Sequence, residues 1–334
     1  MTLAHAWPRI TMSTGSQVWR RGVPGGGDRP PRIRGETRHM VSDDTTRGQQ
    51  GSAEAPELTL NDKAHSVIPQ IGFGTFQIPP EDTQRAVEEA LEIGYRHIDT
   101  AAAYYNEKEV GDALKATGMA GKVWVTTKLR NCDQGYDSTM VAFDRSRSNL
   151  GVDVVDMYLI HWPLPNPKYK DWKELDVETW RGLEELYKAG KVKAIGVSNF
   201  LLHHLENLIQ NCEIMPMADQ IEFHPGFTQE ATVRYCQEKG IYVQAWSPLG
   251  RKRVLEHPLL VGLAEKYNKS AAQICLRYEI QRQVIPLPKA STKERMVQNY
   301  QVFDFEIEKE DMYRIDSMQP AGWSGEHPDF PRVK

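Results

Sequence analysis

The chain lacks any long run of apolar residues. Although 40% of its 334 residues are hydrophobic, none of the runs approaches the roughly 18 apolar residues that indicate a membrane-spanning helix. The net charge of -4 is small, so there is no electrostatic reason to expect nucleic acid or a membrane surface as a partner. We therefore expect a globular chain without a nucleic-acid or membrane partner.

Cysteine is also scarce. The chain has four cysteines, and they lie far apart in the sequence without paired spacing, at Cys132, Cys212, Cys236 and Cys275. This distribution predicts neither a disulfide framework nor a zinc site. We expect no bound metal, and the cytoplasm, which keeps thiols reduced, is the expected location.

The standard nucleotide-binding fingerprints are missing as well. Gly72-Phe73-Gly74 begins like a dinucleotide-binding motif, but Gln77 stands where the third glycine should be, and there is no phosphate-binding Walker loop. Any nucleotide must therefore be held by another kind of site.

Residues 1 to about 55 differ in composition from the rest. They contain many arginines, no lysine and a Gly/Pro-rich block at Pro24–Pro31, and they show little apolar periodicity. This composition predicts a disordered N-terminal extension, or a chain whose real start is Met40. The folded domain is expected to cover residues 56–334.

From residue 58 onward the pattern becomes regular. A small hairpin is expected around Asn61-Asp62, and eight short apolar strands then alternate with amphipathic helices between residues 70 and 300. Eight such units predict a (β/α)8 barrel; alternation alone also permits a doubly wound sheet. After a last helix at Lys309–Ser317, the segment around Trp323 is expected to form a flexible C-terminal substrate loop. The expected strands are Gln70–Phe76 (a first strand and its exit), Tyr95–Asp99, Val123–Leu129, Val155–Ile160, Ala194–Val197, Ala218–Glu222, Tyr242–Trp246 and Val284–Pro286. The expected helices are Pro80–Glu92, Glu107–Ala116, Ser138–Leu150, Val177–Ala189, Leu201–Ile209, Gln229–Lys239, Pro258–Tyr267, Ala271–Gln281 and Lys293–Tyr300.

The stretch from His97 to Glu107 is the centre of the pattern. A strand ends at Asp99, and Tyr104 follows five residues later in the loop. Asn106 is expected to cap the next helix through its side chain, with Glu109 as its capping-box partner. In a parallel α/β fold, the carboxyl ends of strands and the loops after them carry the chemistry.

Polar residues follow the next two strands too. Lys128 ends the third strand and His161 ends the fourth, so a barrel would direct both toward Asp99 and Tyr104 at one rim. Lys128 is expected to lower the pKa of Tyr104, and Asp99 to keep Lys128 charged. With His161 orienting a carbonyl, this set would donate a proton to the carbonyl oxygen.

Other interpretations stay open at this point. Each residue alone could be structural: the Asp–Lys pair a salt bridge, the histidine and the tyrosine packing residues. Lys128 could also be a Schiff-base nucleophile, as in an aldolase, and the barrel could be a binding protein with slow turnover.

A candidate phosphate site opens the helix after the eighth strand. Free N–H groups at a helix start attract anions, and Lys289 and Arg295 add positive charge there. This favours the 2′-phosphate of NADP over NAD; the alternative is a solvated basic helix start. Trp246 offers a flat face for a nicotinamide ring, and amide or hydroxyl groups at Ser198, Asn199 and Gln220 could hold its carboxamide.

Several motifs also occur in one order along the chain. They are Asp99-Thr100-Ala101-x-x-Tyr104, Lys128 with its following loop, Leu159–Pro163, Gly196–Phe200, Gln220–Glu222 and Lys289–Asn299. In these motifs the chain resembles the aldo-keto reductase superfamily, from about Leu58 to the C-terminus. Trp246–Gly250 and Val302–Phe305 resemble the prokaryotic 2,5-diketo-D-gluconate reductase and methylglyoxal reductase branch.

The resemblance implies a monomeric (β/α)8 barrel that reduces small aldehydes, dicarbonyls or keto sugars with NADPH. It implies that Tyr104 is the proton donor, that Lys128 and Asp99 tune it, and that His161 orients the carbonyl. The cofactor residues that it implies are Ser198, Asn199 and Gln220 at the carboxamide, Trp246 stacked on the nicotinamide, Ser247 and Leu249 along the pyrophosphate, Lys289 and Arg295 at the 2′-phosphate and Asn299 near adenine. Phe76, Trp162 and Trp323 would line the substrate pocket.

Two departures from the family pattern stand out. Ala290 replaces the serine that many members carry after the phosphate-binding lysine, which removes one hydrogen bond unless Ser291 or Thr292 supplies it. The loop after the seventh strand is short but basic, so we expect Arg251 to Arg253 to compensate by pairing with cofactor phosphates.

Overall fold

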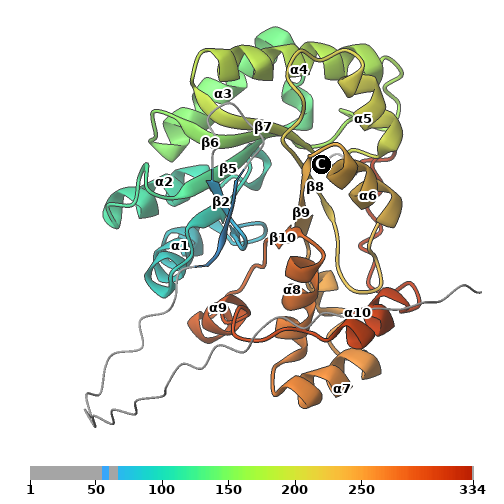
Figure 1. Cartoon of the computed structure of the whole chain (residues 1–334). Helices are drawn as coiled ribbons and strands as arrows, with labels where there is room; N and C mark the ends of the chain where they lie inside the picture. Colours follow the sequence, from blue (N-terminus) through green and yellow to red (C-terminus); the bar gives the residue numbers. More distant parts are fainter. Residues whose placement is uncertain (1–54, 60–66, 333–334) are drawn as a thin grey trace, which may run out of the picture. The chain divides into compact units, whose positions relative to one another are not determined.

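The computed structural model describes residues 55–59 and 67–332. In this part of the chain, eight parallel strands form one sheet, with helices on its outer side (Figure 1). The strands are β3 (Phe73–Gly74), β4 (His97–Asp99), β5 (Trp124–Leu129), β6 (Val155–Ile160), β7 (Val192–Ser198), β8 (Ala218–Glu222), β9 (Tyr242–Trp246) and β10 (Val284–Pro286). They lie side by side in sequence order.

The two ends of the sheet meet. The backbone N–H groups of Gly72 and Gly74 donate to the carbonyl oxygens of Pro286 and Pro288, at 3.0 and 3.1 Å. These bonds join the β3 segment to the β10 segment and close the ring, as a (β/α)8 barrel requires. The predicted barrel is confirmed, and a doubly wound sheet is excluded because the strand order never reverses.

The first strand of the barrel is shorter than expected. The sequence predicts a strand and its exit over Gln70–Phe76, whereas β3 has two residues. Its neighbour contains Pro286 and Pro288, which have no N–H to donate, so the ladder between the two segments cannot run further.

Most helices have the expected positions. Helix α2 has the predicted bounds, whereas α4 begins five residues before the expected Val177. Its added first turn brings Trp172 edge-on against His204 of α5, with ring centroids 4.8 Å apart. The helices are α1 (Pro80–Ile93), α2 (Glu107–Ala116), α3 (Tyr136–Leu150), α4 (Trp172–Lys188), α5 (Leu202–Ile209), α6 (Glu230–Glu238), α7 (Pro258–Tyr267), α8 (Ala271–Gln281), α9 (Lys293–Tyr300) and α10 (Lys309–Asp316).

The hairpin is present where its strands are described. Strand β1 (Glu57–Thr59) pairs antiparallel with β2 (Val67–Pro69). Its predicted turn around Asn61-Asp62 lies outside the described residues, and so does the predicted N-terminal extension apart from Ala55.

Asn106 does not cap α2 in the way that the sequence predicts. It occupies the N-cap position, but its side chain makes no capping hydrogen bond. Its amide nitrogen donates instead to the carbonyl oxygens of Thr75 and Ile78, both at 3.1 Å, and its oxygen accepts from the Thr100 hydroxyl. The capping-box prediction is therefore wrong, because tertiary partners satisfy the buried amide. This side chain ties the segments after β3 and β4 together.

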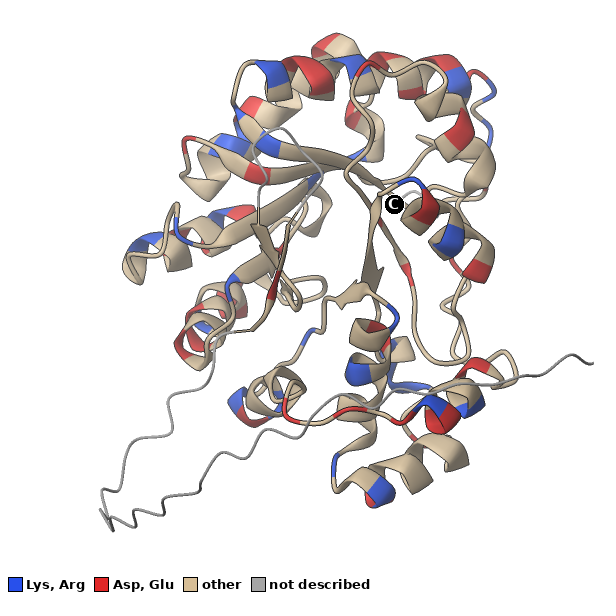
Figure 2. Ribbon diagram, in the orientation of Figure 1, with Lys and Arg blue, Asp and Glu red and all other residues tan. Residues whose placement is uncertain are grey.

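The apolar core lies between the strands and the helices. Buried residues of this layer come from both, for example Val87 of α1, Phe143 of α3 and Ile195 of β7. Charged residues gather on the helices, while the strands carry few (Figure 2). None of the helices in the described part of the chain combines the length and the apolar character that a membrane crossing demands.

Candidate active site

Asp99, Lys128 and Tyr104 meet at the carboxyl end of the barrel. The Lys128 ammonium donates to Asp99 Oδ1 at 2.7 Å, to the Thr100 carbonyl at 2.9 Å and to the Tyr104 hydroxyl at 3.2 Å. Lys128 and Asp99 are buried, whereas Tyr104, on the 3-10 helix η1 (Ala102–Tyr104), is partly exposed. The structure thus brings together the three residues that the sequence predicts.

The electrostatics of this cluster differ from the sequence-based expectation. Burial raises the pKa of Tyr104 above its usual value, and the opposing effect of Lys128 does not cancel the shift. The prediction of a net lowered pKa is therefore wrong. Burial alone would lower the pKa of Lys128, but Asp99 and Tyr104 raise it overall. The cluster consequently holds a neutral phenol against a charged ammonium.

His161 stands beside the tyrosine at the end of β6. The two rings make an edge-on contact, with centroids 5.6 Å apart. Burial, assisted by the Lys128 charge, lowers the pKa of His161 well below its usual value. The imidazole is therefore neutral at neutral pH and can donate one hydrogen bond from one nitrogen.

Strand β8 connects the cluster to the far side of the barrel. The Gln220 amide donates to Asp99 Oδ2 at 2.7 Å and to the Gln244 side-chain oxygen at 2.9 Å. Both N–H bonds of Gln220 are used in this way, which leaves its oxygen for a ligand. Sequence reasoning missed Gln244; a polar residue inside the otherwise apolar strand Tyr242–Trp246 was the available signal.

A second chain of hydrogen bonds links β7 to β9. The indole N–H of Trp246 donates to the Asn199 side-chain oxygen at 2.8 Å, and the Asn199 amide donates to the His161 carbonyl at 2.9 Å. The Ser198 hydroxyl donates to the Gln220 carbonyl at 2.7 Å. All four predicted nicotinamide-binding residues therefore share one network with Asp99 and Lys128.

The residues that follow β7 and β9 have unusual backbone geometry. Asn199 and Ser247 have φ values of 65° and 52°, in the left-handed region that costs energy for residues other than glycine and clusters at functional sites. Beyond Ser247 the 3-10 helix η3 (Gly250–Lys252) turns back, and the Arg251 guanidinium lies 5.8 Å from the centre of the Trp246 ring. Part of the ring proposed to stack on a nicotinamide is thus covered by Arg251.

The start of α9 has the features of an anion site. The Thr292 side chain accepts a hydrogen bond from the Arg295 backbone N–H. Lys289 and Arg295 are exposed, and within the described residues neither side chain forms an ion pair or a hydrogen bond. Lys293, in contrast, pairs with Glu92 at 2.7 Å. Two unpaired cations beside a helix start can receive a phosphate.

The remaining predicted residues lie at different depths. Ala290 is buried, and so is Asn299, inside α9; Leu249 is half-buried. Phe76 packs against Tyr104, with ring centroids 5.0 Å apart. Trp162 is half-buried just after His161, and Trp323 is 48% exposed in the C-terminal segment.

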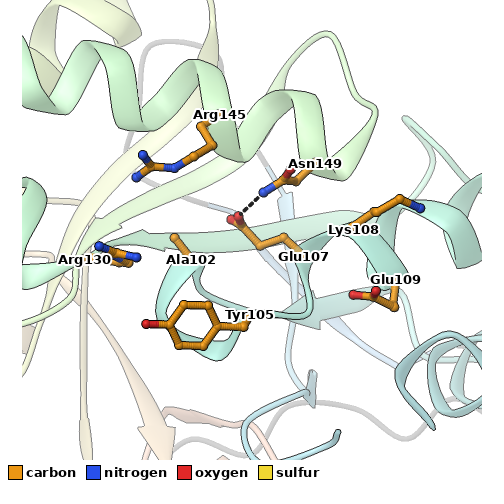
Figure 3. Close-up of a pocket in the computed structure, with 8 residues that line it drawn as sticks. All are labelled: Ala102, Tyr105, Glu107, Lys108, Glu109, Arg130, Arg145 and Asn149. Carbon is orange, nitrogen blue, oxygen red and sulfur yellow. Dashed lines mark hydrogen bonds between the residues drawn. The ribbon is translucent and has the colours of Figure 1, made fainter. Parts of the chain in front are cut away.

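A separate pocket lies behind η1. Figure 3 shows Tyr105 directed toward Arg130, while Arg145 and Asn149 come from α3. The cavity has a volume of about 370 Å³, and Glu107 is held there by Asn149 at 3.2 Å. Tyr105 has a left-handed backbone conformation, and its side chain is 73% exposed. The lining residues are Ala102, Tyr105, Glu107, Lys108, Glu109, Arg130, Arg145 and Asn149.

A group with the composition of a metal site joins α5 to the C-terminal segment. Ligand atoms of His203, His204 and Asp329 lie within 4.8 Å of one another. Nδ1 of His204, however, accepts from the Leu201 N–H at 3.1 Å, so the ring proton is on Nε2, which faces Asp329 at 3.1 Å. A neutral imidazole has one acceptor nitrogen, so His204 has none left for a metal. These residues fasten the C-terminal segment instead.

A comparison with protein-family models agrees with the fold. The model of the Aldo/keto reductase family matches residues 70–320. The match covers far more than half of the chain, and the chain belongs to this family of oxidoreductases.

Relatives and solved structures point the same way. The chain is 45% identical over 264 residues to glyoxal reductase of Bacillus subtilis (strain 168), covering 78% of this chain and 93% of that protein. It is 45% identical over 275 residues to an aldo-keto reductase of Mycobacterium sp. (strain JLS), covering 82% and 97%. The structure of a Bombyx mori aldo-keto reductase in complex with NADP matches with a TM-score of 0.76 and 35% identity, covering 84% of this chain and 100% of that chain.

Proposed function

We propose that this protein reduces the carbonyl groups of small aldehydes, dicarbonyls or keto sugars with NADPH. The observation that carries the proposal is the Lys128 ammonium, which joins the Asp99 carboxylate and the Tyr104 hydroxyl at the mouth of the barrel. Glyoxal reductase, a relative with 45% identity, bears the name of a small dicarbonyl. The same site would accept a keto sugar such as 2,5-diketo-D-gluconate.

The residues at the rim fit an extended dinucleotide. Lys289 and Arg295 lack partners within the described residues and would hold the 2′-phosphate. Ser198, Asn199 and Gln220 would hold the carboxamide of a nicotinamide stacked on Trp246. Ser247 and Leu249 would line the pyrophosphate, and Asn299 would lie near adenine. A bound NADPH would supply the hydride.

The chain itself would supply the proton. Tyr104, kept protonated by burial, would give its hydroxyl proton to the carbonyl oxygen as negative charge develops there. The Lys128 ammonium, 3.2 Å from that hydroxyl, would stabilise the phenolate that remains. Neutral His161 would orient the carbonyl oxygen through a hydrogen bond, and Phe76, Trp162 and Trp323 would contact the rest of the substrate.

A Schiff-base role for Lys128 is disfavoured. The raised pKa of Lys128 keeps the amine protonated, so it lacks the lone pair that attack on a carbonyl needs. A purely binding role is disfavoured because it does not require an ammonium held within hydrogen-bond distance of both a carboxylate and a phenol. We further propose that the protein acts as a monomer in the cytoplasm.

The test is an assay in which the loss of NADPH absorbance is monitored with a panel of carbonyl compounds. The wild-type protein should turn over aldehydes and dicarbonyls. Tyr104→Phe should lower kcat about a thousandfold, within the range of general acid catalysis, and leave NADPH binding unchanged. Near wild-type kcat in Tyr104→Phe would refute the role of the tyrosine, and no turnover of the whole panel would refute the function.

A further inference from the structure

Gln244 is a buried amide beside Gln220 in the interior of the barrel. The two residues are partners in the register of the neighbouring strands β9 and β8, and both are buried. Gln244 shares its side of β9 with Trp246, because residues two apart in a strand point to the same side. It therefore lies one layer deeper in the barrel than the ring proposed to stack on a nicotinamide.

The hydrogen bonds of this layer run in one direction. Gln220 donates both of its N–H bonds, one to Asp99 Oδ2 at 2.7 Å and one to the Gln244 side-chain oxygen at 2.9 Å. An ionised carboxylate has no proton to donate, so the nitrogen of Gln220, and not its oxygen, must face Asp99. Gln244 must then turn its oxygen to Gln220, and its nitrogen donates to the Met157 sulfur at 3.5 Å.

This arrangement contributes little to the stability of Gln244 itself. The thioether sulfur of Met157 is a weak acceptor, and a buried amide costs free energy unless its polar groups are hydrogen-bonded. An apolar side chain of similar length would fill the same space without that cost. The feature that distinguishes a glutamine at this position is therefore the oxygen that it offers to Gln220.

Two hydrogen bonds fix the Gln220 amide where one would not. The last torsion of a glutamine side chain has a broad energy profile, so a single bond to Asp99 would leave the amide plane free to turn about that bond. Bonds from one nitrogen to acceptors on β4 and β9 fix the plane, and with it the direction of the Gln220 oxygen. Within the described residues that oxygen accepts no hydrogen bond, so it is available to a carboxamide.

We propose that Gln244 is a positioning residue that, through Gln220, directs an acceptor oxygen at the carboxamide of the nicotinamide ring. The inference rests on the proposed NADPH-dependent function and adds the residue that makes this site prefer a primary amide to a group without N–H. An acceptor that is oriented in advance binds without first losing conformational freedom.

The experiment compares NADP⁺ with its 3-acetylpyridine analogue, in which a methyl group replaces the amide NH2 and the carbonyl oxygen is kept. Isothermal titration measures Kd for both ligands with the wild-type protein and each variant, and thermal melting checks that each variant is folded. Met157→Leu is the matched control, because it removes the sulfur and leaves the Gln244 oxygen in place. The test variants are Gln244→Met, Gln244→Leu, Gln244→Glu, Gln220→Met and the Gln220→Met/Gln244→Met double variant.

The wild-type protein should bind NADP⁺ about tenfold more tightly than the analogue, which leaves the Gln220 oxygen without a donor. Gln244→Met and Gln244→Leu should reduce this ratio to about threefold or less, mainly by raising Kd for NADP⁺. Burial beside Asp99 favours the protonated form of a glutamic acid, which keeps an acceptor oxygen and a donor, so Gln244→Glu should retain the ratio. Met157→Leu should match the wild type.

The double variant tests whether Gln244 acts through Gln220. Its ratio should equal that of Gln220→Met, because the Gln244 oxygen has no other partner in this layer. A ratio in the double variant that differs from that of Gln220→Met would contradict the proposal.

Other results would also overturn the inference. A wild-type ratio in folded Gln244→Met or Gln244→Leu would exclude positioning by Gln244, and a lost ratio in folded Gln244→Glu would exclude its oxygen as the cause. Equal affinity of the wild-type protein for both ligands would show that Gln220 does not accept from the carboxamide. In these cases NADPH oxidation by the wild-type protein would leave the proposed function intact, whereas a lack of NADP⁺ binding would refute the function and the inference together.

Discussion

The Asp99–Lys128–Tyr104 cluster and the start of α9 each contain a lysine, but they are built in opposite ways. Lys128 is buried and has three hydrogen-bond partners from its own chain. Lys289 and Arg295 are exposed and have no side-chain partner within the described residues. The hydrogen-bond partners of Lys128 are therefore present without a ligand, whereas the cations at the start of α9 are available to bind an anion.

This difference follows from the task proposed for each region. A proton donor must be held within a few tenths of an ångström of its working position, so its neighbours must be fixed in advance. A phosphate carries its own negative charge and acceptor oxygens, so the long, flexible side chains of lysine and arginine can move to bind it. Substitutions in the cluster should therefore change both stability and turnover, and substitutions at α9 should change cofactor affinity alone.

The largest effect is expected from Lys128→Met. It leaves the buried Asp99 carboxylate without its cation, which costs about 3–5 kcal/mol of stability. It also removes the ammonium beside Tyr104, so kcat should fall about a thousandfold. The measurements are urea unfolding and NADPH oxidation at saturating substrate. Tyr104→Phe is the control, with a similar loss of turnover but nearly wild-type stability; equal stability of Lys128→Met and the wild type would contradict a preorganised cluster.

A smaller effect is expected from Lys289→Ala. A charge-assisted hydrogen bond contributes about 1.5–3 kcal/mol, so the KM for NADPH should rise about ten- to a hundredfold. The KM for NADH, which lacks the 2′-phosphate, should change little. Lys293→Ala is the matched control, because Lys293 already pairs with Glu92. Equal increases for both cofactors would argue against a 2′-phosphate site.

A still smaller effect is expected when Arg251, Lys252 and Arg253 are all replaced by alanine. Exposed ion pairs contribute about 0.2–1 kcal/mol each, so NADPH affinity at low salt should fall several-fold, and the difference should vanish at high salt. Isothermal titration at two salt concentrations measures this. Unchanged affinity at low salt would mean that these residues serve protein contacts alone, such as that of Arg253 with Trp323.

The smallest change is expected from pH. The pKa of Tyr104 is raised, so its hydroxyl keeps its proton throughout the range below about pH 10. The pKa of His161 is lowered, so its ring stays neutral above about pH 6.5. The kcat for carbonyl reduction should therefore stay constant within about twofold between these limits. A fall in kcat on the alkaline side of this pH range would mean that the charge of Lys128 lowers the pKa of Tyr104 by more than burial raises it.

Much of the fold could be predicted from local patterns. Strands β6, β8, β9 and β10 and helices α2, α7, α8 and α9 have the predicted bounds. Each is set by its own apolar periodicity and by the glycine or polar residues beside it. The candidate catalytic residues followed from the same patterns, because each comes at the end of a strand or in the loop after it.

Two predictions, the capping role of Asn106 and the lowered pKa of Tyr104, failed for the same physical reason. Asn106 has the sequence context of a helix cap, yet its side-chain amide donates hydrogen bonds to the carbonyl oxygens of Thr75 and Ile78. Tyr104 has a cation beside it, yet the loss of water around the ring dominates its pKa. Both outcomes depend on atoms that reach the site from other parts of the chain, and local reasoning cannot weigh them.

The sequence by itself determined the alternation of strands and helices and the polar residues that follow the strands, since both depend on neighbours along the chain. The tertiary structure alone decided which of these residues meet. Gln220 binds Asp99 across 121 positions of sequence, and Ser324 binds Glu222 across 102. Closing the ring brings such distant positions together, and the burial that results sets the charge states on which the chemistry depends.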